Sequence, residues 1–282
     1  MQNAKLSHTG TAAKNARSAT LCRFGNPQNN MAQLTAIIGG SSLAQLPGLQ
    51  VRERRVVRTP YGETSSPLLF GQIEGASVVF IARHGHGHTI APHRVNYRAN
   101  LWALQASGVA RILAVSSVGG IAQGLQPRDF AVPSQIIDYT TGRDGTFFEG
   151  PDMPVTHIDF ADPFDANLRT VLTRACDEAG KPAHSSGNTY GVTSGPRFET
   201  AAEVRRMQQD GCDMVGMTAM PEAALARELA LEYALLAVVS NRAAGLAKEP
   251  FSVQSMRETL DAVLPSVQMV LSYAARLLQA QE

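Results

Sequence analysis

A loop of small residues that ends in an aromatic residue and a carboxylate stands out in the sequence. The stretch is Gly191-Val-Thr-Ser-Gly-Pro-Arg-Phe-Glu-Thr-Ala-Ala-Glu203, with Phe198 and Glu199 side by side. Thr200 and Glu203 have the spacing of a capping box, so we expect a helix to begin directly after the pair. An aromatic ring can stack on a flat ligand, and a carboxylate can accept a hydrogen bond from the edge of that ligand. Taken alone, a core Phe beside a solvated Glu is the simpler interpretation.

Polar residues suited to holding an anion follow three apolar runs of the strand type. They are Ser41 in a glycine-serine turn, Arg83 with His84, and Ser117 shortly before two glycines. Such turns can offer backbone N–H groups and a hydroxyl to an anion, and a guanidinium is a fixed fork of donors that matches phosphate. A plain tight turn and a solvated loop are the alternative interpretations.

Three histidines at alternate positions, His84, His86 and His88, raise the question of a metal site. No Cys, Asp or Glu lies near them, and the intervening glycines favour a loop over a rigid strand. The G-x-G-x-x-G and P-loop signatures are also missing from the sequence. We therefore expect no metal and no cofactor.

Apolar runs and helix-type periodicity alternate along the chain. Strands are expected at 34–38, 67–73, 77–82, 111–116, 130–137 and 235–239, and helices at 95–107, 165–179, 200–211, 221–231 and 256–277. This alternation predicts a single α/β domain with a central mixed β-sheet flanked by helices. In such sheets the chemistry lies beyond the strand ends, where the candidate residues above are found.

Composition excludes several classes of protein. The 282 residues are 44% hydrophobic and 17% charged, with a net charge of +1. That charge provides no global field for nucleic acid or an anionic membrane, and no apolar run approaches the roughly 20 residues that span a bilayer. The three cysteines are scattered, which suits a reducing compartment and a cytoplasmic protein.

The first thirty residues differ from the rest of the chain. They are rich in Asn, Ala, Ser and Thr and show little periodicity, without the apolar core of a secretion signal. We expect residues 1–30 to be a disordered leader and residues 31–282 to form the folded domain.

Several motifs together resemble one known family. They are Ile37-Ile-Gly-Gly-Ser-Ser-Leu43, Thr59-Pro-Tyr-Gly-Glu63, Ala82-Arg-His-Gly85, Gly195-Pro-Arg-Phe198 and Gly216-Met-Thr-Ala-Met-Pro-Glu222. In this order they resemble the trimeric purine nucleoside phosphorylases, and within them the methylthioadenosine phosphorylase branch. The domain is therefore expected to be a nucleoside phosphorylase domain.

The resemblance implies that inorganic phosphate, as a co-substrate, attacks C1′ of a purine nucleoside. It implies a phosphate subsite, a base subsite and a contact to the ribose. The phosphate subsite would be Ser41, Arg83, His84, Ser117 and Thr218; the base subsite would be Val118, Phe198, Glu199 and Asn241; and Met217 would lie against the ribose. Arg83, His84 and Asn241 would carry the catalysis.

Two residues depart from the methylthioadenosine branch and match the branch that cleaves inosine and guanosine. Glu199 stands where the former usually has Ser, and Asn241 stands where it usually has Asp. An ionised Glu accepts from the N1–H of a 6-oxopurine, and an Asn amide donates towards O6 or N7. Adenine presents the opposite pattern at this edge, and such a mismatch can cost orders of magnitude in kcat/KM.

The residues expected around the ribose 5′-group depart instead from the branch that cleaves inosine and guanosine. Val253 stands where the inosine branch tends to have His, with Met256 one helical turn further on. An apolar wall favours a methylthio group over a hydroxyl. His157 matches a histidine that reaches this region from the neighbouring subunit of a homotrimer in the methylthioadenosine branch. Val253 as plain helix packing is the alternative.

We therefore expect phosphorolysis of 5′-methylthioinosine to hypoxanthine and 5-methylthioribose 1-phosphate. A general inosine/guanosine phosphorylase and a 5′-methylthioadenosine phosphorylase are the alternatives within the family. A nucleoside-binding protein without turnover would not need the combination of Ser41, Arg83, His84 and Thr218.

Overall fold

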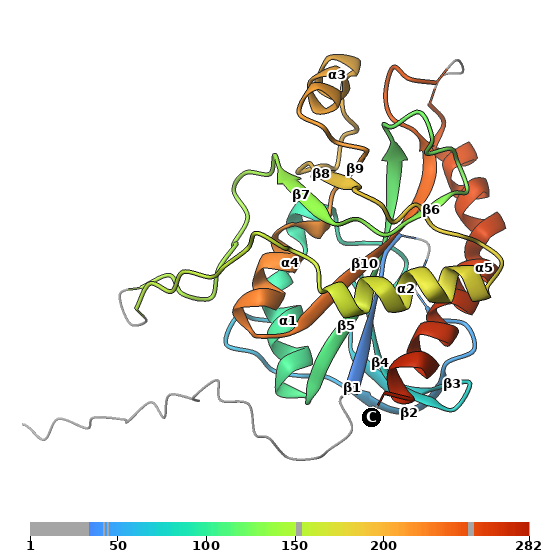
Figure 1. The fold of residues 1–282 in the computed structure, drawn as a ribbon. Helices are drawn as coiled ribbons and strands as arrows, with labels where there is room; N and C mark the ends of the chain where they lie inside the picture. The colour runs from blue at the N-terminus through green and yellow to red at the C-terminus, as the bar shows by residue number, and fades with distance from the viewer. Residues whose placement is uncertain (1–33, 42, 44, 151–153, 248–250, 282) are drawn as a thin grey trace, which may run out of the picture. The chain divides into compact units, whose positions relative to one another are not determined.

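The computed structural model describes residues 34–41, 43, 45–150, 154–247 and 251–281. The leader expected at 1–30 lies outside the described residues. Residues Met31–Glu282 group as one compact unit. Figure 1 shows the helices and strands of this unit in order along the chain.

The described residues form a ten-stranded mixed sheet. Its strands are β1 (Leu34–Gly39), β2 (Gln50–Arg55), β3 (Leu68–Ile73), β4 (Ala76–Ala82), β5 (Val109–Gly120), β6 (Phe130–Ala131), β7 (Gln135–Asp138), β8 (Thr189–Val192), β9 (Met214–Gly216) and β10 (Glu232–Arg242). The order is β2-β3-β4-β1-β5-β9-β8-β7, with β10 paired to β5 and β6. β1 is parallel to β4 and β5, β10 is parallel to β5, and β2–β3, β3–β4, β5–β9 and β6–β10 are antiparallel. The predicted mixed sheet is confirmed.

β3 and β4 form a β-hairpin. The strands pair antiparallel, and Glu74 and Gly75 connect them with φ of 46° and 86°. Two successive left-handed residues give the turn a twist that matches the flanking strands, and Gly75 adopts this conformation without steric cost.

The single strand predicted over 130–137 is wrong. The chain forms two short strands there, β6 against β10 and β7 against β8, with Pro133 between them. Proline has no N–H to donate to a ladder, so the segment changes partners at this point. β2, which is exposed along its whole length, was not predicted, because it lacks the apolar run that marked the buried strands.

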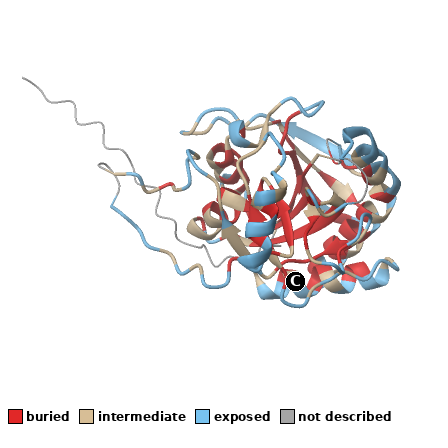
Figure 2. Ribbon diagram, turned by 90° about the horizontal axis from the view of Figure 1, so that it is seen from above, coloured by how far each residue is buried: buried red, intermediate tan, exposed pale blue. Residues whose placement is uncertain are grey.

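Helices cover both faces of the sheet. They are α1 (Tyr97–Ala106), α2 (Ala166–Glu178), α3 (Ala201–Gln209), α4 (Ala219–Glu228) and α5 (Val253–Gln279), with a 3₁₀ turn at Pro92–Arg94. α2 and α5 lie together and pack on one face of the sheet, while α1 and α4 pack on the other (Figure 1). The buried residues lie between these layers, as Figure 2 shows.

Two predicted helix starts are confirmed by their caps. The Thr200 hydroxyl accepts from the N–H of Glu203, and the Glu203 carboxylate accepts from the N–H of Thr200, which completes the capping box. The carboxylate of Asp165 accepts from the N–H of Leu168 at the start of α2. The capping box fixes α3, so the residues directly before it, Phe198 and Glu199, are held at a defined place.

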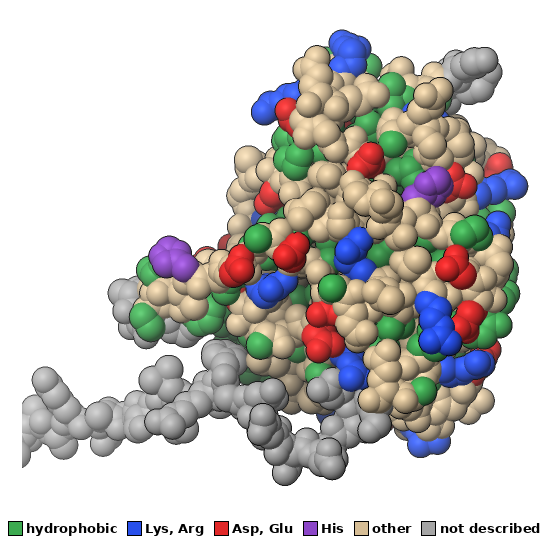
Figure 3. Space-filling model, viewed as in Figure 1, with side chains coloured by type: hydrophobic (Ala, Val, Ile, Leu, Met, Phe, Trp, Pro, Cys, Tyr) green, Lys and Arg blue, Asp and Glu red, His purple; other side chains and the backbone are tan. Residues whose placement is uncertain are grey.

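The surface of the described chain carries charges of both signs. On the face in Figure 3, basic and acidic side chains are interspersed, in keeping with the net charge of +1. Among the described residues, none of the helices combines the length and the apolar character that crossing a bilayer requires.

Candidate active site

A cavity of about 490 Å³ opens where several strands end. Its walls come from the residues after β1, β4 and β9 and from the last residues of β5 and β10. This is the end of an α/β sheet at which loops gather, and the volume suits a small ligand.

Most residues expected from the sequence line this cavity. They are Ser41, Arg83, His84, Ser117, Val118, Phe198, Glu199, Met217, Thr218, Asn241 and Met256. Two expected residues, Val253 and His157, do not line the cavity. Val253 is the first residue of α5 and is 45% exposed, and His157 lies in an exposed extended segment.

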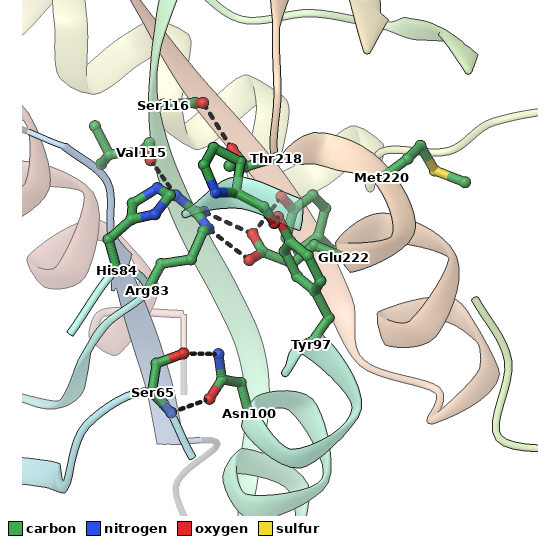
Figure 4. Close-up of polar contacts among 12 residues, drawn as sticks. Ser65, Arg83, His84, Tyr97, Asn100, Val115, Ser116, Thr218, Met220 and Glu222 are labelled. Carbon is green, nitrogen blue, oxygen red and sulfur yellow. Dashed lines mark hydrogen bonds and ion pairs between the residues drawn. The ribbon is translucent and has the colours of Figure 1, made fainter. Parts of the chain in front are cut away.

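Arg83 is fully buried in an ion pair with Glu222, drawn in Figure 4. Its Nε and Nη2 each donate to one oxygen of the carboxylate at 2.7 Å, and its Nη1 donates to the carbonyl of Val115 at 2.9 Å. Tyr233 donates its hydroxyl to Glu222 at 2.9 Å. Burial alone would lower the pKa of Arg83, but the adjacent carboxylate raises it above its ordinary value. Three of the five N–H donors are engaged, so two remain.

His84 presents an unprotonated nitrogen. Its Nδ1 lies 2.8 Å from the carbonyl of Ile90, and a carbonyl can only accept, so Nδ1 carries the proton. Burial, and then the charge of Arg83, lower the pKa of His84 to about 3. The imidazole is therefore neutral near pH 7, and Nε2 offers a lone pair.

The hydroxyl of Thr218 belongs to a buried network. Thr218 precedes α4 but makes no side-chain capping bond. Its Oγ1 lies 2.9 Å from the Oγ of Ser116, which lies 3.1 Å from the hydroxyl of Tyr190. The network fixes the position of the Thr218 hydroxyl at the cavity wall.

The turn after β1 approaches the buried ion pair closely at Gly40. A Cβ at this position would lie 2.6 Å from the carbonyl oxygen of Val115 and 3.4 Å from Nη1 of Arg83. Only glycine lets the backbone come this near, and the approach brings Ser41 to the cavity beside Arg83.

Two aromatic rings line the cavity at its exposed side. Phe198 and Phe251 are 42% and 44% exposed, with ring centroids 4.3 Å apart. Together they offer apolar surface against which a flat ring can pack.

Two polar side chains, Glu199 and Asn241, line the same cavity. Glu199 accepts from the hydroxyl of Thr193 at 2.6 Å. The Nδ2 of Asn241 donates to the carbonyl of Arg242 at 2.8 Å, and its Oδ1 accepts from Ser240 at 2.7 Å. Because a carbonyl can only accept, this contact fixes the orientation of the amide and leaves one N–H of Asn241 for a ligand.

Several residues of the site were not found from the sequence. Glu222 was expected only at a helix start, and Ser116, Thr193, Tyr233 and Phe251 had no assigned role. The Pro-Glu pair at the end of a matched motif was the one available signal, for Glu222. Among the described residues, no group of three or more His, Cys, Asp or Glu side chains could hold a metal ion.

Comparisons with known proteins confirm the resemblance. Residues 35–276 match the family model of the phosphorylase superfamily. The chain is 49% identical over 245 residues to a probable S-methyl-5′-thioinosine phosphorylase of Pseudomonas syringae pv. tomato, which covers 87% of this chain and 98% of the relative. It is 47% identical over 216 residues to a 6-oxopurine nucleoside phosphorylase of Pyrococcus furiosus, with coverage of 75% and 80%. The structure of methylthioadenosine phosphorylase from Schistosoma mansoni in complex with adenine superposes with a TM-score of 0.85 at 32% identity, with coverage of 89% and 93%.

Gly40→Ala should weaken the binding of inorganic phosphate. The added Cβ collides with the Val115 carbonyl and pushes the turn away from Arg83. We expect a roughly tenfold higher Kd, about 1.4 kcal/mol, measured from the rise in melting temperature with phosphate concentration. Gly124→Ala is the matched control, since its Cβ meets nothing nearer than 3.9 Å. An unchanged phosphate response in Gly40→Ala would contradict the close approach.

The lowered pKa of His84 makes stability depend on pH in a defined window. In the unfolded chain His84 binds a proton below its ordinary pKa of 6.5, whereas in the folded protein it binds this proton only below about pH 3. The contribution of neutral His84 to the free energy of unfolding is therefore complete above pH 6.5. It decreases as the pH is lowered from 6.5 towards 3, by about 1.4 kcal/mol per pH unit. Denaturant unfolding near pH 7 and near pH 5 measures how much free energy of unfolding is lost between the two pH values. This loss should be smaller in His84→Gln than in the wild type. The exposed His93→Gln serves as control; equal losses in all three proteins would refute the effect.

Proposed function

The chain belongs to the phosphorylase superfamily, and we propose that it cleaves 5′-methylthioinosine by phosphorolysis, releasing hypoxanthine and 5-methylthioribose 1-phosphate. The expected enzyme class, a purine nucleoside phosphorylase, is confirmed by the family and by the curated relatives. The observation that carries the choice of base is the pair of Glu199 and Asn241 in the cavity, one an acceptor and the other holding an unshared donor.

This pair complements the edge of a 6-oxopurine. Glu199 accepts from the N1–H of the base, and the remaining N–H of Asn241 donates to O6 or N7. Phe198 and Phe251 supply the faces for the ring, and Val118 also lines the cavity. An adenine ring would direct its N1 lone pair at an ionised carboxylate, which disfavours 6-aminopurines.

Phosphate occupies the opposite part of the cavity, between Ser41, Arg83, His84, Ser117 and Thr218. The two unshared N–H groups of Arg83 and the hydroxyls hold its oxygens. Nε2 of the neutral His84 accepts a hydrogen bond from the O–H of a bound phosphate monoanion. Because the pKa of His84 is about 3, the proton stays on the phosphate.

The reaction then needs no covalent enzyme intermediate. The bond between C1′ and N9 breaks with its electron pair moving to the purine, and the sugar becomes oxocarbenium-like, as in glycosidases. The negative charge of the bound phosphate stabilises the positive charge on the sugar, and a phosphate oxygen forms the new bond to C1′. The N–H of Asn241 stabilises the negative charge on the leaving purine.

Apolar residues at the cavity support a 5′-methylthio group. Met256 and Met217 line it, whereas Val253 lies at the exposed start of α5 outside the lining. The support therefore comes from Met256 and from the thioinosine-cleaving relative more than from Val253. A general 6-oxopurine nucleoside phosphorylase is the second candidate, favoured by the Pyrococcus furiosus relative of that name.

The test is kcat/KM for methylthioinosine, inosine and methylthioadenosine, each with and without phosphate. We expect methylthioinosine to lead, with methylthioadenosine poorer by about a hundredfold or more, because buried polar groups mismatch at its edge. A preference for methylthioadenosine would overturn the base assignment, and a preference for inosine would establish the second candidate. Equal turnover without phosphate would mean hydrolysis instead of phosphorolysis.

We also propose a homotrimer in which His157 of a neighbouring subunit contacts the 5′-group. The segment that carries it is exposed, with Val155 72% exposed, and in Figure 1 it runs outward from the helices. An exposed extended segment with apolar side chains is suited to burial against a second chain.

Light scattering should therefore give three times the chain mass of 30.1 kDa. His157→Ala should raise the KM for methylthioinosine severalfold while the KM for phosphate stays unchanged, because only the ribose end loses a contact. The mass of the variant serves as the control for assembly. A monomer in the wild type, or unchanged kinetics in a trimeric variant, would contradict the arrangement.

A further inference from the structure

Thr193 follows β8 directly, does not line the cavity, and donates its hydroxyl to Oε1 of Glu199 at 2.6 Å. We propose that Thr193 is the positioning residue that sets the base selectivity of the enzyme. It occupies one oxygen of the Glu199 carboxylate and so holds the other oxygen ready for the N1–H of a 6-oxopurine. This inference rests on the proposed function of the cavity.

The backbone of Thr193 is held without help from its side chain. Its N–H donates to the carbonyl of Gly216 at 2.9 Å, and its carbonyl accepts from Nη2 of Arg143 at 3.3 Å. Nη2 of Arg143 also donates to Ser194 at 2.9 Å, and its Nη1 donates to the carbonyl of Met220. The hydroxyl is thus presented from a fixed point, and the fold of the loop does not depend on it.

Glu199 also has a charged neighbour in the sequence, but that residue does not orient the Glu199 carboxylate. Arg197 lies two residues earlier, but it donates from both of its Nη groups to Glu203, at 2.7 and 2.8 Å. Glu203 in turn belongs to the capping box of α3. Among the residues that the structure describes, the short bond from Thr193 is therefore the contact that orients Glu199.

A half-buried glutamate without such a contact would explore several rotamers. Ordering it at the moment of binding costs side-chain entropy, and an oriented acceptor avoids that cost. A hydrogen bond to a charged group is also stronger than one between neutral groups. Removing the hydroxyl should thus penalise the substrate whose N1–H uses Glu199, and much less a substrate that lacks this donor.

The inference is tested with Thr193→Val, which keeps the shape and deletes the hydroxyl. We expect kcat/KM for methylthioinosine to fall about tenfold, mainly through KM for the nucleoside, while KM for phosphate is unchanged. The ratio of kcat/KM between methylthioinosine and methylthioadenosine should shrink by a similar factor. Thr193→Ser, which restores the hydroxyl, should recover most of the ratio.

Two further proteins make the result decisive. Thr173→Val is the matched control, since this hydroxyl bonds within α2, and it should keep the wild-type ratio. Thr193→Ala repeats the deletion in case the valine side chain disturbs folding, which melting temperatures would reveal. An unchanged ratio in either folded deletion variant, or an equal loss on both nucleosides, would overturn the role of Thr193. A wild type that prefers methylthioadenosine would instead overturn the proposed function, so the two failures are distinguishable.

Discussion

The buried ion pair between Arg83 and Glu222 is the constraint on which the site depends. It ties the end of β4 to the first turn of α4 across the core, and both side chains have no exposed surface. A buried charge without a partner would be strongly destabilising, so each residue requires the other. Because three N–H groups of Arg83 are engaged, the guanidinium is held in one orientation, and two of its N–H groups remain unshared. The approach of Gly40 to the same guanidinium adds Ser41 to this arrangement.

The sequence was sufficient for the family, the mixed sheet and most of the cavity wall. Ser41, Arg83 and Asn241 could be found because each follows or ends a strongly apolar strand, and parallel strands bring their ends together. The partners of these residues could not be found in this way. Glu222 is 139 positions from Arg83, and no local pattern encodes a pairing over that distance. The break at Pro133 was missed because apolar residues lie on both sides of it, at 130–132 and at 136–137.

The part of the site near the ribose 5′-group shows a second limit of prediction from the sequence. Val253 and Met256 are one helical turn apart, and only Met256 lines the cavity, because the start of α5 leaves Val253 at the surface. Helical spacing groups such residues on one face but does not decide which turn reaches a ligand. His157 depends on a second chain, and a single sequence carries no geometry for that contact. The parts of the site formed within one sheet are thus the parts that sequence reasoning reached.

The exposed ring pair of Phe198 and Phe251 has a thermodynamic consequence. Both rings are more than 40% exposed, so this part of the cavity keeps apolar surface in contact with water. A purine that stacks there removes that surface from the solvent. The heat capacity of the protein then falls on binding, and the enthalpy of nucleoside binding becomes more favourable as temperature rises. Heat capacity therefore reports on this aromatic wall separately from the polar contacts at the base edge.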